Sequence, residues 1–169
     1  MSESDRVSYR LVPLEEHHVT GMLRIFNRHV AEGFAAYPEQ PVGEETIEAL
    51  LRQVADSPAA AAEAEDGALL GFGFLRGYSP YSTFAHTAQI TIFLNAQHTR
   101  AGIGTAVLRH LEDGAQRQGI TKILAHVSSR NPASLAFHTK HGFTECGRFP
   151  EIGRKWGVPF DVVWMIKSL

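Results

Sequence analysis

The stretch Thr99-Arg100-Ala101-Gly102-Ile103-Gly104-Thr105 stands between a strand-like run at 88–94 and a helix-like run that begins near Gly102. A strand, a glycine-rich turn and a helix in this order bring unpaired backbone N–H groups and the positive end of the helix dipole to one point. Glycine lacks a Cβ, so a phosphate group can approach the backbone closely. The stretch therefore predicts an anion-binding loop followed by a helix.

Two common phosphate-binding motifs do not fit this loop. The P-loop needs a lysine and a hydroxyl residue after its last glycine, and no lysine is present here. The dinucleotide fingerprint needs a third small residue where Val107 stands. Many glycine pairs before helices bind nothing, so the loop alone leaves a phosphate site and a plain helix start both open.

Composition limits the class of protein. The chain has 169 residues, 44% of them hydrophobic and 20% charged, with a net charge of −2. This balance is ordinary for a globular protein and gives no reason to expect a nucleic-acid or membrane partner. Cys146 is the lone cysteine, which fits a reducing compartment, and neither a signal peptide nor an apolar run long enough to span a bilayer is evident. We expect one cytoplasmic domain over residues 1–169.

Hydrophobic periodicity predicts an alternation of strands and helices. The expected strands cover 7–12, 59–65, 68–75, 87–94, 122–128, 143–149 and 160–166, and the expected helices cover 14–31, 44–55, 102–118 and 132–142. The alanines of 59–65 favour a helix, but the hairpin signal Asp66-Gly67 that follows favours a strand. We predict a mixed α/β fold in which helices pack on one main sheet.

Several motifs occur together with the loop. They are Ile92-Phe93-Leu94 in a strand, Arg100-Ala101-Gly102-Ile103-Gly104, Asn131-Pro132-Ala133-Ser134-Leu135-Ala136-Phe137-His138, Gly142-Phe143 with Gly147, and Gly153-Arg154-Lys155 with Asp161-Val162-Val163. Looser matches in the N-terminal half are Ile25-Phe26-Asn27, the loop at 34–37 and Gly71-Phe72-Gly73. With these motifs the chain resembles the GCN5-related N-acetyltransferase (GNAT) superfamily, within it the group of phosphinothricin and methionine sulfoximine acetyltransferases.

The resemblance implies a mixed central sheet of about seven strands flanked by four helices, acetyl-CoA as co-substrate, no metal, and a homodimer. It also implies that Ile92, Phe93 and Leu94 lie along the pantetheine arm and that Thr99, Arg100, Ala101, Gly102, Ile103, Gly104 and Thr105 hold the pyrophosphate. Asn131, Ser134 and Lys140 complete the expected coenzyme site. A primary amine of a small molecule, an amino acid or an analogue, is then expected to attack the thioester directly.

One departure from the resemblance bears on the chemistry. The related enzymes carry a glutamate, proposed as the base for the amine, where this chain has Gln89. An amide orients a substrate or a water but takes no proton at neutral pH. A CoA-binding sensor that has lost its chemistry is therefore the alternative interpretation.

His138 is the remaining candidate for proton transfer. It stands where many members of the superfamily have a tyrosine that protonates the leaving thiolate, and the pKa of an imidazole lies near 6.5. His86 is a candidate for the acceptor site, or a histidine at a strand edge. His17-His18 is predicted as an exposed pair on a helix, without a metal role.

The acceptor pocket is expected where two aromatic loops meet the central strand. Its candidate residues are Phe34, Tyr37, Tyr78, Ser79, Tyr81, His86, Gln89 and Thr91, and Arg76 is the nearest arginine. Aromatic loops also serve to fill a core, so both interpretations stay open for Phe34 and Tyr37. Trp156, Phe160 and Trp164 are expected in the core or at a subunit contact.

Overall fold

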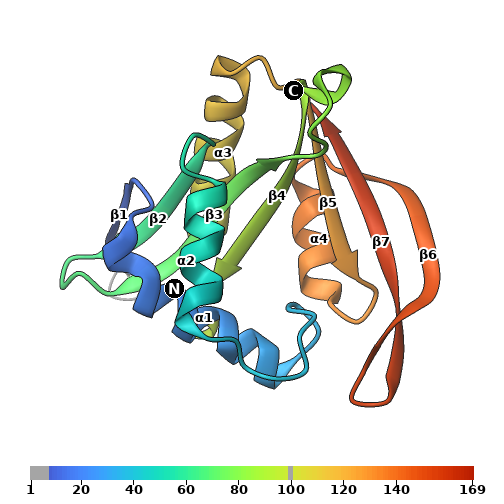
Figure 1. The fold of residues 1–169 in the computed structure, drawn as a ribbon, viewed down its shortest axis with the longest axis horizontal. Coiled ribbons are helices and arrows are strands. Elements are labelled where there is room, and N and C mark those ends of the chain that lie inside the picture. The colour runs from blue at the N-terminus through green and yellow to red at the C-terminus, as the bar shows by residue number, and fades with distance from the viewer. Residues whose placement is uncertain (1–7, 99–100) are drawn as a thin grey trace.

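The computed structural model describes residues 8–98 and 101–169. Seven strands form one sheet in the order β1-β2-β3-β4-β5-β7-β6 (Figure 1). They are β1 (Tyr9–Val12), β2 (Ala59–Ala64), β3 (Leu69–Gly77), β4 (Thr87–Leu94), β5 (Lys122–Ser128), β6 (Thr144–Lys155) and β7 (Val158–Ser168). Every neighbouring pair is antiparallel except β4 and β5, which are parallel.

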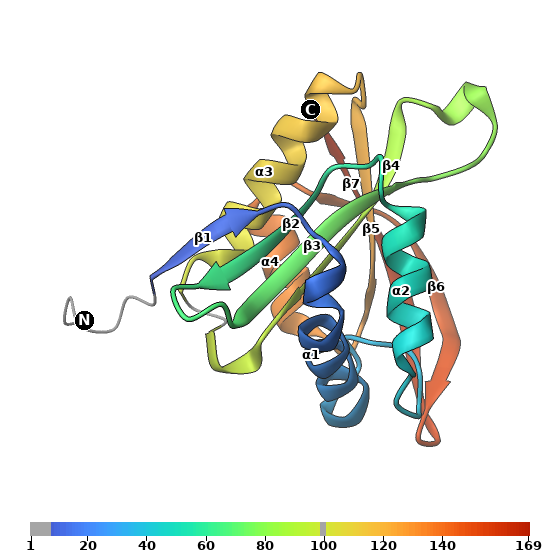
Figure 2. The same cartoon turned by 60° about the vertical axis from the view of Figure 1, so that its left-hand side comes forward.

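Helices cover both faces of the sheet (Figure 2). They are α1 (Val19–Glu32), α2 (Glu44–Gln53), α3 (Ile103–Arg117) and α4 (Pro132–Lys140), with short 3₁₀ segments at Glu16–His18, Ser82–Phe84 and Ala96–His98. Seven strands and four α-helices within the described residues confirm the predicted fold class. No helix in residues 8–98 or 101–169 is both long and apolar enough to cross a bilayer.

Each face of the sheet has its own apolar core. On one face α3 buries Ile103, Val107 and Leu111, which follow the four-residue spacing of one helical stripe. On the other face α1 and α2 pack over the phenylalanines of β3. Gly73 of β3 lets α3 approach closely, because a Cβ there would lie 2.6 Å from a methyl group of Val107.

The sheet opens between its two parallel strands. β4 and β5 pair only over three positions, from Thr87 opposite Lys122 to Gln89 opposite Leu124. Beyond that point β4 stays paired with β3, β5 stays paired with β7, and the two ribbons diverge (Figure 1). Residues 90–94 and 125–128 thus face a gap in the sheet rather than each other.

The C-terminal hairpin is longer than the sequence pattern predicts. The expected strands at 143–149 and 160–166 extend to Lys155 and begin at Val158, with a tight turn at Trp156 and Gly157, whose φ angles are 50° and 75°. The pairing of β6 with β7 shifts register after Glu145 and after Phe149. Such bulges break the two-residue alternation on which the prediction depended.

Lys155 fastens this hairpin to the N-terminal half of the chain. The residue is fully buried, and its Nζ donates hydrogen bonds to the carbonyl oxygens of Val30, Gly33 and Ala36 at 2.8, 2.7 and 2.7 Å. An ammonium group has three donors, so all three are used. The contacts pair carbonyl groups at the end of α1 and fix the loop that follows it.

Replacing Lys155 by Met keeps the length of the side chain but leaves three carbonyl groups without this donor. We expect the free energy of unfolding to fall by about 2–4 kcal/mol, because an unpaired buried polar group costs about 1–3 kcal/mol. Chemical denaturation measures this loss. The control Lys122→Met removes a surface bond to Ser168 and should change stability by less than about 0.5 kcal/mol. Equal losses in both variants would contradict the anchoring role of Lys155.

Candidate functional site

A cavity of about 680 Å³ lies at the gap between β4 and β5, between the α1 and α2 side of the sheet and α4. This is within the usual size of a small-molecule site. Its wall includes 35–38 in the loop after α1, Thr46, Leu50 and Gln53 of α2, Phe72, Phe74 and Arg76 of β3, 90–93 of β4, 125–128 of β5, and Asn131, Ser134 and His138 at α4. The wall is mainly apolar with a few polar groups.

Tyr37 reaches the cavity from the loop that Lys155 fixes. Its hydroxyl lies 3.0 Å from Nδ1 of His126, and the two rings stack at 5.6 Å between centroids. The other side of Tyr37 stacks on Phe160 at 5.7 Å. Burial raises the pKa of Tyr37 to about 12, so the side chain remains a neutral phenol.

Arg76 brings a cationic group to the cavity wall and is hydrogen-bonded to Gln89. They are register partners on β3 and β4, and Nε and Nη2 of Arg76 donate to Oε1 of Gln89 at 3.3 and 3.1 Å. Arg76 lines the cavity, whereas Gln89 does not. Burial first and the charge of Arg76 second lower the pKa of His126, so that imidazole is neutral at pH 7.

His138 stands on the opposite wall. It is 8% exposed, and its Nδ1 lies 2.8 Å from the carbonyl oxygen of Ser134. A carbonyl oxygen only accepts, so Nδ1 carries the proton and Nε2 of the neutral ring is a proton acceptor. Burial lowers the pKa of His138, against an opposing effect of the Ser134 bond. Before it donates to a leaving group, Nε2 must therefore gain a proton.

The predicted anion-binding loop leads into α3. Gly102 has a φ of 80°, which a residue with a Cβ rarely adopts, and it stands directly before the first turn of the helix. Gly104 serves close packing, because a Cβ there would lie 3.2 Å from Leu94 and from Phe137. The hydroxyl of Thr105 donates to Nε2 of His141 at 3.0 Å. Thr99 and Arg100 lie outside the described residues.

The other predicted coenzyme residues divide into two groups. Ile92, Phe93, Asn131 and Ser134 line the cavity, while Leu94, Ala101, Ile103 and Lys140 do not. Oδ1 of Asn131 accepts the N–H of Ser134 as the cap of α4, which leaves the Asn131 amide group as its donor for a ligand. The carbonyl of Leu94 accepts from Nε2 of His29 at 2.8 Å.

Of the predicted acceptor residues, Tyr37 and Thr91 line the cavity. The cavity wall does not include Phe34, Tyr78, Ser79, Tyr81 or His86. Phe34 packs edge-on against Trp156 and Phe160, and Tyr78 packs against Phe84. Tyr81 is 71% exposed. The second aromatic loop thus lies apart from the cavity in this structure.

His126 is the polar group that the sequence analysis missed. It lies on β5 two residues after Leu124, and alternation along a strand places both side chains on one face. The strand pattern thus predicts which face of the sheet carries His126, but it does not predict that a cavity lies next to it. The wall supplied by α2 was also missed; it combines Ile47 and Leu50 of the apolar stripe with polar side chains such as Thr46.

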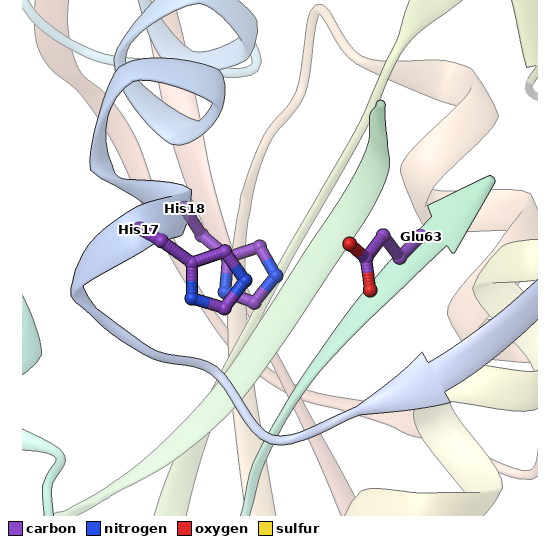
Figure 3. Close-up of side chains that lie close together, drawn as sticks. All are labelled: His17, His18 and Glu63. Atoms are coloured by element: carbon purple, nitrogen blue, oxygen red, sulfur yellow. The ribbon is translucent and has the colours of Figure 1, made fainter. Parts of the chain in front are cut away.

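A second group of polar side chains lies at the far end of the sheet (Figure 3). His17, His18 and Glu63 offer ligand atoms within 4.8 Å of one another, and Arg10 pairs with Glu63 at 3.2 Å. The prediction of an exposed histidine pair is wrong for His18, which is 3% exposed in a 3₁₀ turn. Nε2 of His18 has no hydrogen-bond partner.

The hydrogen bond to His18 fixes the proton on its ring. Nδ1 accepts the backbone N–H of Glu15 at 3.1 Å, as part of a capping box. In the neutral ring the proton is therefore on Nε2, the nitrogen that a metal ion would need. The bonds of His18 to Glu15 and of Arg10 to Glu63 fit a helix cap that lies beside an ion pair. That this group binds no metal stays a prediction.

Comparison with known proteins identifies the family of this chain. The family model described as Acetyltransferase (GNAT) family matches residues 14–143. The chain belongs to this family and is an acetyltransferase of the GNAT type, as the motifs predicted.

Two relatives of known activity are similar to this chain in sequence. Phosphinothricin N-acetyltransferase of Alcaligenes faecalis is 32% identical over 152 residues, which cover 86% of this chain and 75% of that protein. The L-methionine sulfoximine/L-methionine sulfone acetyltransferase of Pseudomonas aeruginosa is 28% identical over 151 residues, 88% of each chain.

Solved structures share the whole fold. The ribosomal-protein-alanine N-acetyltransferase of Brucella melitensis superposes with a TM-score of 0.87 at 27% identity, over 95% of this chain and 99% of that one. A phosphinothricin acetyltransferase of Sinorhizobium meliloti, in complex with acetyl-CoA, gives 0.89 at 23% identity, over 95% and 88% of the two chains. The similarity to the Sinorhizobium meliloti structure is a similarity of fold alone.

Two buried histidines and the half-buried His126 should make the fold sensitive to acid. Burial lowers the pKa of His18, His126 and His138 in the folded chain, whereas the pKa of an unfolded histidine is about 6.5. The unfolded chain therefore binds more protons as the pH falls below about 6.5, and the stability present above that value is lost. We expect the melting temperature to fall between about pH 7.5 and pH 5.5.

The variant His18→Gln should show a smaller fall over the same range. A glutamine at this position of a capping box can keep the bond to the Glu15 N–H, and it does not titrate. The exposed His110 on α3 offers the matched control His110→Gln, which should behave like the parent chain. A fall in His18→Gln as large as in the parent would exclude His18 as a source of the acid sensitivity.

Proposed function

We propose that this protein transfers the acetyl group of acetyl-CoA to the primary amine of an amino acid or amino-acid analogue. The observation that carries the proposal is the cavity at the gap between β4 and β5, because it lies beside unpaired strand positions of 90–93 and the start of α4. An extended pantetheine arm fits such a gap as an added strand would. We also propose a cytoplasmic homodimer.

The coenzyme would lie along the exposed side of β4. Ile92 and Phe93 would flank the pantetheine arm, and the Asn131 amide group would donate to it. The first turn of α3, beginning at Ile103, offers N–H groups and a dipole for the pyrophosphate. Thr99 to Thr105, Ser134 and Lys140 complete the proposed coenzyme site.

The acceptor would occupy the part of the cavity under Tyr37. Arg76 is its cationic group and would pair with the carboxylate of an amino acid. The relatives that act on methionine sulfoximine, methionine sulfone and phosphinothricin support a substrate of this class, since each is an amino-acid analogue. Thr91 of the central strand lies on the same wall.

The chemistry needs a nucleophilic amine and a proton for the departing thiolate. The amine nitrogen attacks the thioester carbonyl, and the carbon–sulfur bond breaks as the amide forms. Nε2 of His138 receives a proton that the amine nitrogen loses and passes it to the sulfur, which agrees with its tautomer. Positioning of the two substrates supplies much of the remaining rate.

A screen of amino acids and analogues with acetyl-CoA, read by release of free thiol, tests the proposal. We expect amine-dependent release that is strongest for substrates with a free carboxylate. Tight acetyl-CoA binding without release for any amine would overturn the proposal and favour a CoA-binding sensor, the alternative to which Gln89 points.

Replacing His138 by Phe should lower kcat by about 100-fold, a typical contribution of one general acid–base group. The aromatic ring remains, so its contacts with Phe137 and Phe143 are preserved. The control is His110→Phe on the exposed side of α3, for which we expect parental turnover. If turnover of His138→Phe matches that of the control, His138 has no part in the reaction.

A further inference from the structure

The site contains a second imidazole that the proposed function has not used. We infer that His126 is the proton acceptor for the amine of the acceptor substrate, the role that the amide of Gln89 cannot perform. This inference rests on the proposed acetyl transfer, and it concerns how this chain achieves that transfer with an amide on its central strand.

The position of His126 fits the role. Gln89 lies opposite Leu124 at the last paired position of β4 and β5, and His126 follows two residues later on the same face. It therefore stands where the strands separate, on the cavity wall beside Arg76. A base at this point would face an amine held between the two strands.

Tyr37 holds the ring by its Nδ1 atom. The distance of 3.0 Å permits either partner to donate. When Nδ1 donates to the phenol oxygen, Nε2 is left with a free lone pair, as in an imidazole base oriented by a second group. The proposal requires this tautomer, and the ring stacking with Tyr37 and the contact with Trp164 keep the ring in place.

The surroundings keep the imidazole neutral at pH 7, the form that has a lone pair for a proton. Arg76 on β3 and Tyr37 on the loop after α1 are the titratable groups that interact with it, while Gln89 and Trp164 on the neighbouring strands carry no charge. The positive charge of Arg76 and partial burial both favour the neutral ring. Glu45 of α2 and His138 of α4 are the other titratable side chains on the cavity wall.

The substrate ammonium loses two protons during the proposed reaction. Nε2 of His126 takes one proton from the substrate ammonium, and the freed lone pair attacks the thioester carbon. The carbon–sulfur bond breaks, and the second amine proton reaches the sulfur through His138. His126 then releases its proton to water. An ammonium and a thioester thus become an amide, a thiol and one proton in solution.

The first experiment measures thiol release against pH for the parent chain, His126→Gln and the exposed control His110→Gln. We expect kcat/KM of His126→Gln to fall by about 100-fold at pH 7. The loss should shrink near pH 10, where solution supplies the free amine. Acetyl-CoA affinity and melting temperature, measured in parallel, should stay close to those of the control. A parental pH profile in His126→Gln would overturn the inference.

The second experiment restores a base at the neighbouring position. Gln89→Glu places a carboxylate next to Arg76, so in the His126→Gln background it should raise kcat/KM at pH 7 by at least about 10-fold. In the parent background the same change should have little effect, because His126 already takes the proton. No rescue in the double variant would count against a missing base as the cause of the loss.

A third variant separates proton transfer from substrate recognition. Tyr37→Phe removes only the hydroxyl that orients Nδ1, and it should lower kcat by about 3- to 10-fold without changing acetyl-CoA affinity. A rise in KM for the amino acid with kcat unchanged, in this variant and in His126→Gln, would overturn the inference and make His126 a carboxylate ligand. Absence of thiol release in the parent chain would instead overturn the proposed function together with this inference.

Discussion

The site depends on how briefly β4 and β5 pair. A parallel ladder of three positions joins the two halves of the sheet, and then each strand follows its antiparallel neighbour in a different direction. Unpaired backbone groups are costly when buried, so a gap of this kind suits a ligand that hydrogen-bonds as a strand does. The same divergence opens the cavity, so the proposed substrate and coenzyme sites meet at one point.

The loop over the cavity depends on a contact made far away in the sequence. Lys155 of β6 ties Gly33 and Ala36 down, and Tyr37 comes next in the chain. The ring of Tyr37 is then held between His126 and Phe160, one from each of two neighbouring strands. The C-terminal hairpin thus shapes the acceptor side of the site, although its own turn lies away from the chemistry.

Local signals predicted much of the fold. The strand at 87–94 and the strand at 122–128 agree with the structure at both ends, and Asn131 caps α4 as its residue type and the following proline indicated. The candidate site was harder, because the approach of His126 to Tyr37 depends on strand divergence and on Lys155, which no local pattern encodes. The predicted second aromatic loop, at 78–82, does not reach the cavity.

A base for the amine need not occupy one fixed position in such a site. Any acceptor on the side of the sheet that carries Arg76 and Tyr37, close to the point where β4 and β5 part, can reach an amine held in the gap. Gln89 and His126 both lie on that face: Gln89 of β4 is opposite Leu124 of β5, and His126 follows Leu124 by two residues. In the proposed mechanism, the Gln89 amide that accepts from Arg76 would leave this cation in place for a carboxylate, while the His126 imidazole would take the proton. In this proposal, recognition of the substrate carboxylate by Arg76 and proton transfer by His126 are assigned to separate side chains.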